Sequence, residues 1–434
     1  MRIRLIAVAM LLGCGGGGSD TPDAIDGPMI DGAADAPAPD APIDAPIDAA
    51  IDATDATPDA LDSAVDAPDG APDAAVDAPV DAAPDAAPDA APDAPVDAAT
   101  DAPIDGPPPC VVPAFTTGVS TLTGCEIAGA VDGPRGTARL ANPANVAVGP
   151  DGDIYIADFD NHRIRVATPA GAVRTLTQQT GFIKPFGLAF GAGGALYVTT
   201  DDNPLGQHSQ LTGTLWQVDT TTGAATPLVA DIGRPRGLTA LADGRLALAD
   251  YLHHVVRIYD PGTGQLTTLA GTFDEAGLVD DTGAAARFFR PYGLTQLPDG
   301  SLAVADFANH VIRRVTLAGE VTTLAGTGAM GDDDGAALTA AQFSFPQDVA
   351  GAADGTLYIA DTGNYVVRRL RTGTVDTVIG AGTAGWLDAD DRRAAQLHGL
   401  EGIDLATTGL LYIADGSHGE DLPFHRIRVS TTPP

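Results

Sequence analysis

The stretch YIADFDNHRIRV, residues 155–166, decides the fold because close copies of it return along the chain. LAVADFANHVIRRV spans residues 302–315 and LYIADTGNYVVRRL spans residues 357–370. In each copy, apolar and small residues alternate as in a half-buried strand, and a turn then leads into a second apolar run. The sequence therefore predicts several copies of one β-hairpin.

The first strand of this hairpin can be aligned six times after Val119. The six copies are IYIAD (154–158), LYVTT (196–200), LALAD (246–250), LAVAD (302–306), LYIAD (357–361) and LYIAD (411–415). One apolar run precedes each copy and, in the first five units, two follow it, so each unit is expected to form a four-stranded antiparallel meander. A single meander cannot bury both faces, whereas six packed in a ring can. We predict an all-β fold, a six-bladed β-propeller.

The two ends of this repeat region fit together. The sixth unit stops after its third strand, at HRIRV (425–429), and lacks a fourth. VSTLTG (119–124) has the pattern of the missing strand, because it matches VTTLAG (321–326). We therefore predict that the N-terminal strand completes the last blade and closes the ring.

A different composition precedes the repeats. Residues 20–109 contain 23 Asp and no Glu, Lys, Arg or aromatic residue. Their frequent prolines exclude a helix, and alanine and aspartate offer too little apolar area to order a chain. We predict a disordered linker over 20–109, followed by the propeller over 110–434. The net charge of −35 and the absence of a basic run argue against a nucleic-acid partner.

The N-terminus has the pattern of an export signal. Arg2 and Arg4 precede a short apolar run that cannot span a bilayer. Leu11-Leu12-Gly13-Cys14 then resembles the bacterial lipobox. This resemblance implies a lipoprotein signal peptide at 1–13, a lipid-anchor cysteine and Gly-rich tether at 14–19, and lipidation of Cys14. The protein would be anchored at the cell envelope, at the outer membrane or cell surface. An ordinary secretory signal with a chance cysteine is the alternative.

Export bears on the other two cysteines. Cys110 and Cys125 flank the predicted closing strand. In an oxidising compartment we expect them to form a disulfide that pins this strand, the alternative being two unpaired thiols.

The repeated residues resemble those of the NHL repeat. The hairpin pattern is Asp-x-x-Asn-His-x-Ile, at Asp158, Asn161, His162, Ile164 and at Asp306, Asn309, His310, Ile312. A phrase between blades also fits, at Gly124, Asp132, Gly133, Ala138, Leu140 and Pro143. The resemblance covers residues 119–429 and departs at Thr199-Thr200 and His253-His254. The family includes ligand- and protein-binding domains, sensors and a few metal-dependent lyases, so it names no reaction.

Unusually long connections all fall on one face of the predicted ring, and such loops are usually functional. The first strand of each blade begins at that face, near the axis. The residue after the proline position there reads Ala144, Phe186, Arg236, Tyr292, Gln347 and Glu401. Because these residues differ, one shared structural need does not hold them. Phe186, Arg236, Tyr292, Gln347 and Glu401 are therefore candidate ligand-binding residues, with an ordinary wet channel lining as the alternative.

Signatures of catalysis are mostly missing. The chain has no Gly-x-Ser-x-Gly, phosphate-binding loop or His-Glu-x-x-His. The run Asp332–Gly335 lacks the first and last ligands of a calcium loop. The sharpest catalytic alternative is one divalent ion, Ca or Zn, held by His398, Glu401 and His418 at the channel mouth.

We therefore favour a non-enzymatic, membrane-anchored binding or scaffolding module without a cofactor, acting through its long-loop face. Its partner would be an extracellular or periplasmic protein or a small polar ligand. A metal-dependent lactonase, hydrolase or lyase is the alternative, and a purely structural envelope protein a third reading. We also expect a monomer, because a closed propeller has no free sheet edge to donate.

Overall fold

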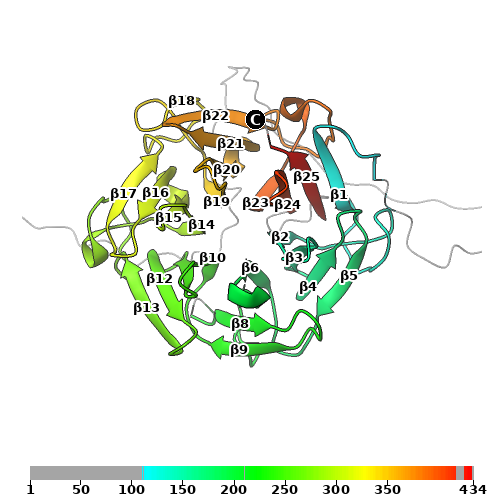
Figure 1. Ribbon diagram of the computed structural model, residues 1–434, viewed down its shortest axis with the longest axis horizontal. Coiled ribbons are helices and arrows are strands. Elements are labelled where there is room, and N and C mark those ends of the chain that lie inside the picture. The colour runs from blue at the N-terminus through cyan, green and yellow to red at the C-terminus, as the bar shows by residue number, and fades with distance from the viewer. Residues whose placement is uncertain (1–109, 111, 210, 417–424, 433–434) are drawn as a thin grey trace, which may run out of the picture. The chain divides into compact units, whose positions relative to one another are not determined.

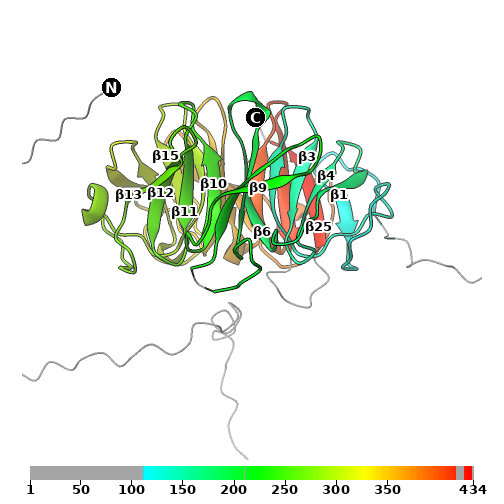
Figure 2. The ribbon, with the colours of Figure 1, turned by 90° about the horizontal axis from the view of Figure 1, so that it is seen from below.

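The computed structural model describes residues 110, 112–209, 211–416 and 425–432. Within them, six antiparallel sheets surround one axis, five with four strands and one with five (Figure 1). The strands of each sheet run roughly along the ring axis when the ring is seen edge-on (Figure 2). The predicted six-bladed propeller is confirmed.

The blades follow one another in chain order, each with its innermost strand first. Blade 1 is β2 (Pro143–Val148), β3 (Ile154–Asp158), β4 (Arg163–Ala167) and β5 (Val173–Thr177); blade 2 is β6 (Pro185–Phe190), β7 (Leu196–Thr200), β8 (Thr214–Val218) and β9 (Ala225–Val229); blade 3 is β10 (Pro235–Ala240), β11 (Leu246–Asp250), β12 (Val255–Asp260) and β13 (Gln265–Ala270). Blade 4 is β14 (Pro291–Gln296), β15 (Leu302–Asp306), β16 (Val311–Val315) and β17 (Val321–Ala325); blade 5 is β19 (Pro346–Gly351), β20 (Leu357–Asp361), β21 (Val366–Arg371) and β22 (Thr374–Ile379), with β18 (Gly335–Ala336) outside; blade 6 is β23 (Gly399–Leu405), β24 (Leu410–Gly416), β25 (His425–Thr431) and β1 (Val119–Cys125).

The repeated run seen in the sequence is the second strand of each blade. In β3, β7, β11, β15 and β20 every residue is buried. This follows from position, because the strand lies inside its sheet and neighbouring blades cover both faces. Apolar side chains of adjacent blades form the cores, as where Phe182 and Trp216 meet with ring centroids 5.4 Å apart.

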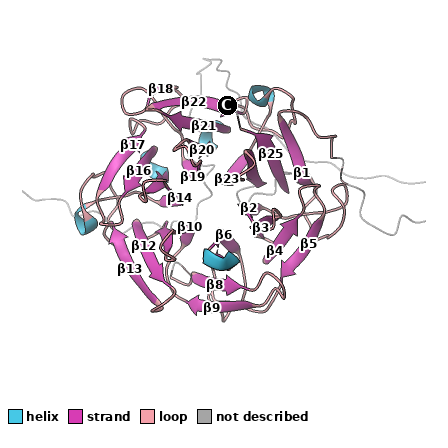
Figure 3. Cartoon of the chain, viewed as in Figure 1, coloured by secondary structure: helices cyan, strands magenta, loops and turns pink. Residues whose placement is uncertain are grey.

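Strands dominate the ring, and the described helices are single 3-10 turns (Figure 3). These turns are η3 (Ala192–Gly194), η4 (Gly283–Ala285), η5 (Phe307–Asn309), η6 (Thr362–Asn364) and η7 (Arg392–Ala394). Among the residues that the structure describes, no helix is long and apolar enough to cross a membrane.

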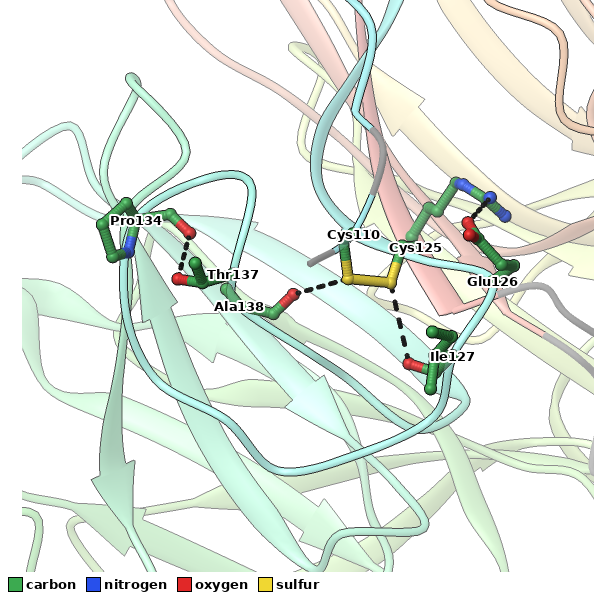
Figure 4. Close-up of a disulfide and its surroundings, with 8 residues drawn as sticks. Cys110, Cys125, Glu126, Ile127, Pro134, Thr137 and Ala138 are labelled. Atoms are coloured by element: carbon green, nitrogen blue, oxygen red, sulfur yellow. Dashed lines mark hydrogen bonds and ion pairs between the residues drawn. A yellow bond between two sulfur atoms is a disulfide. The ribbon is translucent and has the colours of Figure 1, made fainter. Parts of the chain in front are cut away.

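The ring closes as the sequence predicts. Strand β1 pairs antiparallel with β25, with Val119 opposite Ser430 and Cys125 opposite His425. The disulfide is also present, with the sulfur atoms of Cys110 and Cys125 1.99 Å apart (Figure 4). The Cys110 N–H donates to Gly136 O at 3.1 Å, so the segment before β1 is tied to the connection that leads into blade 1.

The connections that enter four blades also cover their outer strands, which the sequence did not indicate. In blade 5 the covering residues form β18, which pairs with β22. Single bridges do the same in blades 1, 4 and 6, between Gly133 and Val173, Thr282 and Glu320, and Ala389 and Val119. No such bridge covers β9 or β13 within the described chain. The expectation that ring closure leaves no free sheet edge is therefore wrong, because closure completes a blade but leaves each outer strand facing outward.

Candidate ligand-binding site

The long-loop face is the face of the ring that carries the turns between second and third strands and the connections between blades. Its long segments include residues 201–213, 271–290, 326–345 and 380–398, of which 210 lies outside the described residues. Each innermost strand begins at this face, as shown by the pairing of Pro143 with Asp158 at the end of the second strand.

The aspartate that ends most second strands is a buried structural group. The Asp158 carboxylate is fully buried and accepts hydrogen bonds from Arg165 Nη1 at 2.7 Å and Asn161 Nδ2 at 2.8 Å. The same ion pair recurs in three other blades, as Arg313–Asp306 (2.8 Å), Arg368–Asp361 (2.8 Å) and Arg428–Asp415 (2.9 Å). These carboxylates fasten the blades and are not free for catalysis. Sequence reasoning missed the arginine, although Asp and Arg lie seven residues apart in three of these four blades and thirteen apart in the last.

The repeated histidines are also occupied. His162, His254 and His310 each have a left-handed backbone, with φ of 56°, 58° and 55°. Their Nδ1 atoms accept N–H groups of the next blade, from Lys184 (3.3 Å), Arg290 (3.2 Å) and Phe345 (3.1 Å). They therefore act as hydrogen-bonded turn residues in separate blades and do not converge on one ion.

Three of the candidate ligand-binding residues meet near the axis. The rings of Phe186 and Tyr292 have centroids 5.6 Å apart, and Arg236 Cζ lies 4.2 Å from the Phe186 centroid. Ala144 packs in the same cluster. Only 3% of Phe186 and 7% of Tyr292 is exposed, so these side chains pack on one another. Sequence reasoning selected these positions without foreseeing this direct contact.

A second set of residues completes this cluster, and sequence reasoning missed it. It comprises the residues that directly follow the second strands of the first four blades. Their contacts with the next blade are Phe159 with Phe186 (centroids 5.9 Å), Asp201 with Arg236 (2.7 Å), Tyr251 with Tyr292 (5.5 Å) and Phe307 with Phe345 (5.0 Å). In blade 5 the equivalent residue is Thr362, whose hydroxyl donates to Leu400 O at 2.8 Å. The available signal was the variation itself, since these positions differ from blade to blade as the first set does.

The Arg236 guanidinium is held in place. It donates to both oxygens of Asp201, at 2.7 and 3.2 Å, and Asp201 is 1% exposed. Burial lowers the pKa of Arg236, but Asp201, Tyr292, Glu401 and Tyr251 together outweigh this effect, and the pKa is raised overall. The cation is therefore preorganised at the mouth, with 11% of its side chain exposed.

Acidic and amide groups lie on the other side of the axis. Glu401 is 4% exposed and acts electrostatically on both Arg236 and Tyr292. Burial, and then Glu401, raise the pKa of Tyr292 well above its usual value. Burial, and then Glu401, also raise the pKa of Asp160. Gln347 is 1% exposed, and its Oε1 has no hydrogen-bond partner in the described chain. A buried acceptor of this kind calls for water or a ligand atom.

The candidate metal residues are only partly placed. The His398 ring stacks on Tyr365 with centroids 5.8 Å apart, and the backbone N–H of His398 donates to Asp415 Oδ1 at 2.9 Å. His418 lies outside the described residues. In the described ranges, no group of three or more His, Cys, Asp or Glu side chains is placed to hold a metal ion. The metal-site prediction stays a prediction.

A separate cavity of about 240 Å³ lies further along the innermost strands. All six of these strands line it, through residues that follow the ring positions. Asp348 lines it and accepts the N–H groups of Ile403 and Val349, both at 2.9 Å. Burial raises the pKa of Asp348 to about 7, and repulsion from Asp404 adds to the effect. Asp404 in turn accepts Val148 N–H at 2.7 Å, so these carboxyls link blades 5, 6 and 1.

Exposed apolar side chains gather on the long-loop face. Leu205 is 82% exposed and Leu211 58% in the turn of blade 2. Phe273, Met330 and Trp386 are exposed in the connections that follow blades 3, 4 and 5. The tight turns of the opposite face carry none of the large exposed apolar residues of the described chain. Exposed apolar side chains of this kind often mark a surface that a partner covers.

Comparison with known proteins matches one repeat by sequence. The NHL repeat family model matches residues 140–167. The chain is 30% identical over 182 residues to Protein SUPPRESSOR OF QUENCHING 1, chloroplastic, of Arabidopsis thaliana, covering 42% of this chain and 14% of that protein. It is 28% identical over 296 residues to NHL repeat-containing protein 2 of Bos taurus, covering 56% and 40%. The chain thus spans less than half the length of these relatives.

Solved structures share the fold. A structural genomics protein of unknown function from Bacteroides thetaiotaomicron has a TM-score of 0.60 and 19% identity, covering 73% of this chain and 76% of its own. An auxiliary nutrient binding protein from the same organism has a TM-score of 0.58 and 19% identity, covering 72% and 75%. At this identity the likeness is one of fold.

Proposed function

We propose that this protein is a non-enzymatic binding module of the bacterial cell envelope and that the centre of its long-loop face is the binding site. One observation carries the proposal. The residues that meet at the axis differ from blade to blade, whereas the Asp–Arg pair that fastens the blades repeats in four of them. Variation concentrated in one cluster of contacting side chains is expected where a ligand, rather than the fold, selects the side chains.

The chemistry of this site favours a small amphipathic ligand or an amphipathic side chain of a protein partner. The half-buried rings of Phe159, Tyr251 and Phe345 offer apolar contacts. The fixed Arg236 cation and the Glu401 side offer polar contacts of opposite sign. The exposed apolar residues around the mouth extend the surface that a partner would cover.

Catalysis is not needed to account for these groups. The repeated carboxylates and imidazoles are engaged in structural hydrogen bonds, and the axial groups are mainly aromatic. One of the structures of similar fold is described as an auxiliary nutrient binding protein, which agrees with the proposal without carrying it. We further propose that Cys14 anchors the exported protein to the membrane, that it works without a cofactor, and that it is a monomer.

A ligand screen with two matched arginine variants tests the site. Thermal unfolding of the full chain would be followed with sugars, aromatic amino acids, nucleosides and hydroxy acids. Arg236→Gln alters the axial cation, whereas Arg245→Gln alters an arginine of the same blade that pairs with Asp243 in a tight turn of the opposite face. We expect a compound that raises the wild-type Tm to lose its effect with Arg236→Gln and keep it with Arg245→Gln. Equal effects in both variants would refute the axial site.

A further inference from the structure

The outer rim of four blades contains the same carboxylate-binding arrangement, filled by the chain's own aspartate. In blade 4, Asp280 of the preceding connection accepts hydrogen bonds from Arg313 Nη2 at 2.6 Å, Thr323 N at 2.9 Å and Thr323 Oγ1 at 3.1 Å. Arg313 Nη2 also donates to Val279 O at 2.9 Å. The guanidinium therefore binds the carbonyl of one residue and the carboxylate of the next. This arrangement fits an extended segment that contains an aspartate.

The other three copies repeat this geometry. Asp132 binds Arg165 (2.6 Å) and Thr175 N (3.0 Å), Asp388 binds Arg428 (2.8 Å) and Thr121 N (2.9 Å), and Asp334 binds Arg368 (2.7 Å) and Thr377 Oγ1 (3.1 Å). The preceding carbonyls of Val131, Leu387 and Asp333 accept from the same guanidinium groups. The recurrence shows what this pair of Arg and Thr selects: an extended x-Asp segment on the blade edge.

Blade 3 has the arginine and the threonine of this arrangement but lacks the aspartate. Arg257 lies opposite Thr268 in the strand register, as Arg313 lies opposite Thr323. Arg257 Nη1 donates to Ile232 O at 3.0 Å and is 3.8 Å from Asp250. No described carboxylate takes the place that Asp280 fills in blade 4. The reason is the short connection before blade 3, residues 230–234, which cannot reach the outer edge.

This place is accessible. Arg257 keeps 17% of its side chain exposed beside Phe273, whose ring centroid is 5.4 Å from Cζ, and Thr268 is exposed. Burial lowers the pKa of Arg257, and Asp250 offsets this only in part, so a second carboxylate would stabilise the cation.

The backbone edge beside this arginine is open as well. In blade 4, Val321 N donates to Asp281 O at 2.8 Å, so the covering connection pairs with the strand edge. The matching strand of blade 3, β13, has no covering bridge in the described chain and contains neither proline nor a charged residue. It lies at the outer rim of the ring (Figure 1). An unpaired edge of this kind is a template for an added strand.

Blade 2 shows that the other uncovered edge is closed to such a segment. Trp216 stands where the other blades have arginine, and Pro227 interrupts the edge strand. The Gln179 side chain also caps Ala225, accepting its N–H at 3.1 Å and donating to its carbonyl at 2.7 Å. Blade 3 alone, among the described blades, combines the open edge with the unfilled arginine.

We propose that the outer edge of blade 3 binds an extended, aspartate-containing peptide segment of another protein, with its backbone paired to β13 and its carboxylate seated between Arg257 and Thr268. The segment adds a fifth strand, as β18 does in blade 5, and the charge-assisted bonds at the aspartate set the register. This site lies on the rim and is independent of the axial mouth.

The test uses the peptide GLVDDTG, the sequence of residues 277–283 that fills the equivalent place in blade 4. Its dye-labelled form would be titrated with the purified full chain by fluorescence anisotropy. The control peptide carries Asn in place of Asp280. We expect saturable binding of the first peptide and at least about tenfold weaker binding of the control, because the control loses the charge-assisted hydrogen bonds of the carboxylate.

Protein variants locate the binding. Arg257→Gln should weaken it at least about tenfold, and Thr268→Pro, which removes the edge N–H at an exposed position, should abolish it. Thr268→Ser keeps both donors and should bind as the wild type does. Thermal unfolding of each variant shows whether it is folded, and the two Thr268 variants suffice if Arg257→Gln does not fold.

Three results would overturn the proposal. These are equal binding of the two peptides, unchanged binding to Thr268→Pro, and no saturable binding at millimolar peptide. Dimerisation of the chain that Thr268→Pro abolishes would instead assign the edge to a second copy, and would also overturn it.

Discussion

Blades 1 and 4 differ from blades 2 and 3 at the outer edge, although all four are built from one repeat. In blades 1 and 4 a buried arginine binds the aspartate of its own second strand and a second aspartate from the connection that covers the edge. Blade 2 replaces the arginine by Trp216, whose indole N–H donates to Thr200 Oγ1 at 2.8 Å. Blade 3 keeps Arg257 but lacks the covering aspartate.

This difference separates the residues that hold the ring together from the residues that remain available for binding. Where arginine and both aspartates are present, both carboxylates are paired with the arginine and the edge is covered. Where one part is missing, the blade either substitutes an apolar core or leaves a donor set unused. The repeat is therefore structural, and its interruptions indicate sites.

The largest effect is expected from removing a fully paired arginine. Arg313→Ala leaves Asp306, which is fully buried, without its cation. Loss of one partner of a buried pair costs about 3–5 kcal/mol of unfolding free energy. Arg257→Ala should cost less, about 1.5 kcal/mol, the low end for a hydrogen bond from a charged group. The loss is smaller because Asp250 keeps His253 Nδ1 at 2.8 Å. Urea unfolding of both variants measures the contrast, and equal losses would contradict it.

The disulfide should matter next, because it holds the strand that closes the ring. The two cysteines are separated by 15 residues, for which loop closure contributes about 3 kcal/mol. Replacing both cysteines by serine should lower the unfolding free energy by this amount in guanidinium. Reductant should produce the same loss in the wild type and none in the variant. A variant as stable as the oxidised protein would show that pairing of β1 with β25 is sufficient for closure.

A pH effect is expected where the closing blade meets blade 5. The pKa of Asp348 is raised to about 7 by burial and by Asp404, from 3.8, so between these values the folded state binds more protons than the unfolded state. Stability from this carboxyl is full below about pH 4 and is lost as the pH rises through about 7.

Asp348→Asn cannot titrate. From pH 5 to pH 8 the wild type should therefore lose on the order of 1–3 kcal/mol more unfolding free energy than the variant, at about 1.4 kcal/mol for each unit of pKa shift. Urea unfolding at the two pH values measures this. Parallel pH dependence in the two proteins would show that Asp348 is ionised in the folded state.

The smallest effect sharpens the comparison of edges. Thr323→Val removes the hydroxyl that donates to Asp280 at 3.1 Å and should cost about 0.5–1 kcal/mol. Thr268→Val, at the matching position of blade 3, removes a hydroxyl that has no carboxylate partner in the described chain and should be close to neutral. Paired unfolding curves decide this, and a larger loss at Thr268 would mean that its hydroxyl is already engaged.

The architecture could be predicted from the sequence because the same strand and turn pattern occurs several times along the chain. The run IYIAD and its copies became the buried second strands, and VSTLTG became the strand that completes blade 6. Local patterns of this kind suffice because alternation and turn residues act over a few positions. The disulfide was expected because an exported protein folds in an oxidising compartment and the two cysteines flank the closing strand.

Contacts between blades could not be predicted in the same way. The partners of Arg165 and Arg313 lie on connections more than thirty residues away, and only the folded ring brings them together. The axial candidates Phe186, Arg236 and Tyr292 were selected because they differ between blades, but their partners Phe159, Asp201 and Tyr251 were missed. Glu401 and Gln347 were placed at the axis, whereas His418 lies outside the described residues.

The central claim is that the variable axial cluster of the long-loop face binds the ligand. Hydrogen–deuterium exchange of the full chain, with and without the strongest compound from the thermal screen, tests it most directly. Slower exchange at residues 201–209, 234–237 and 251–254, with the tight turns at 149–153 and 241–245 unchanged, is the predicted result. Protection confined to those tight turns would contradict the claim and move the binding site to the opposite face.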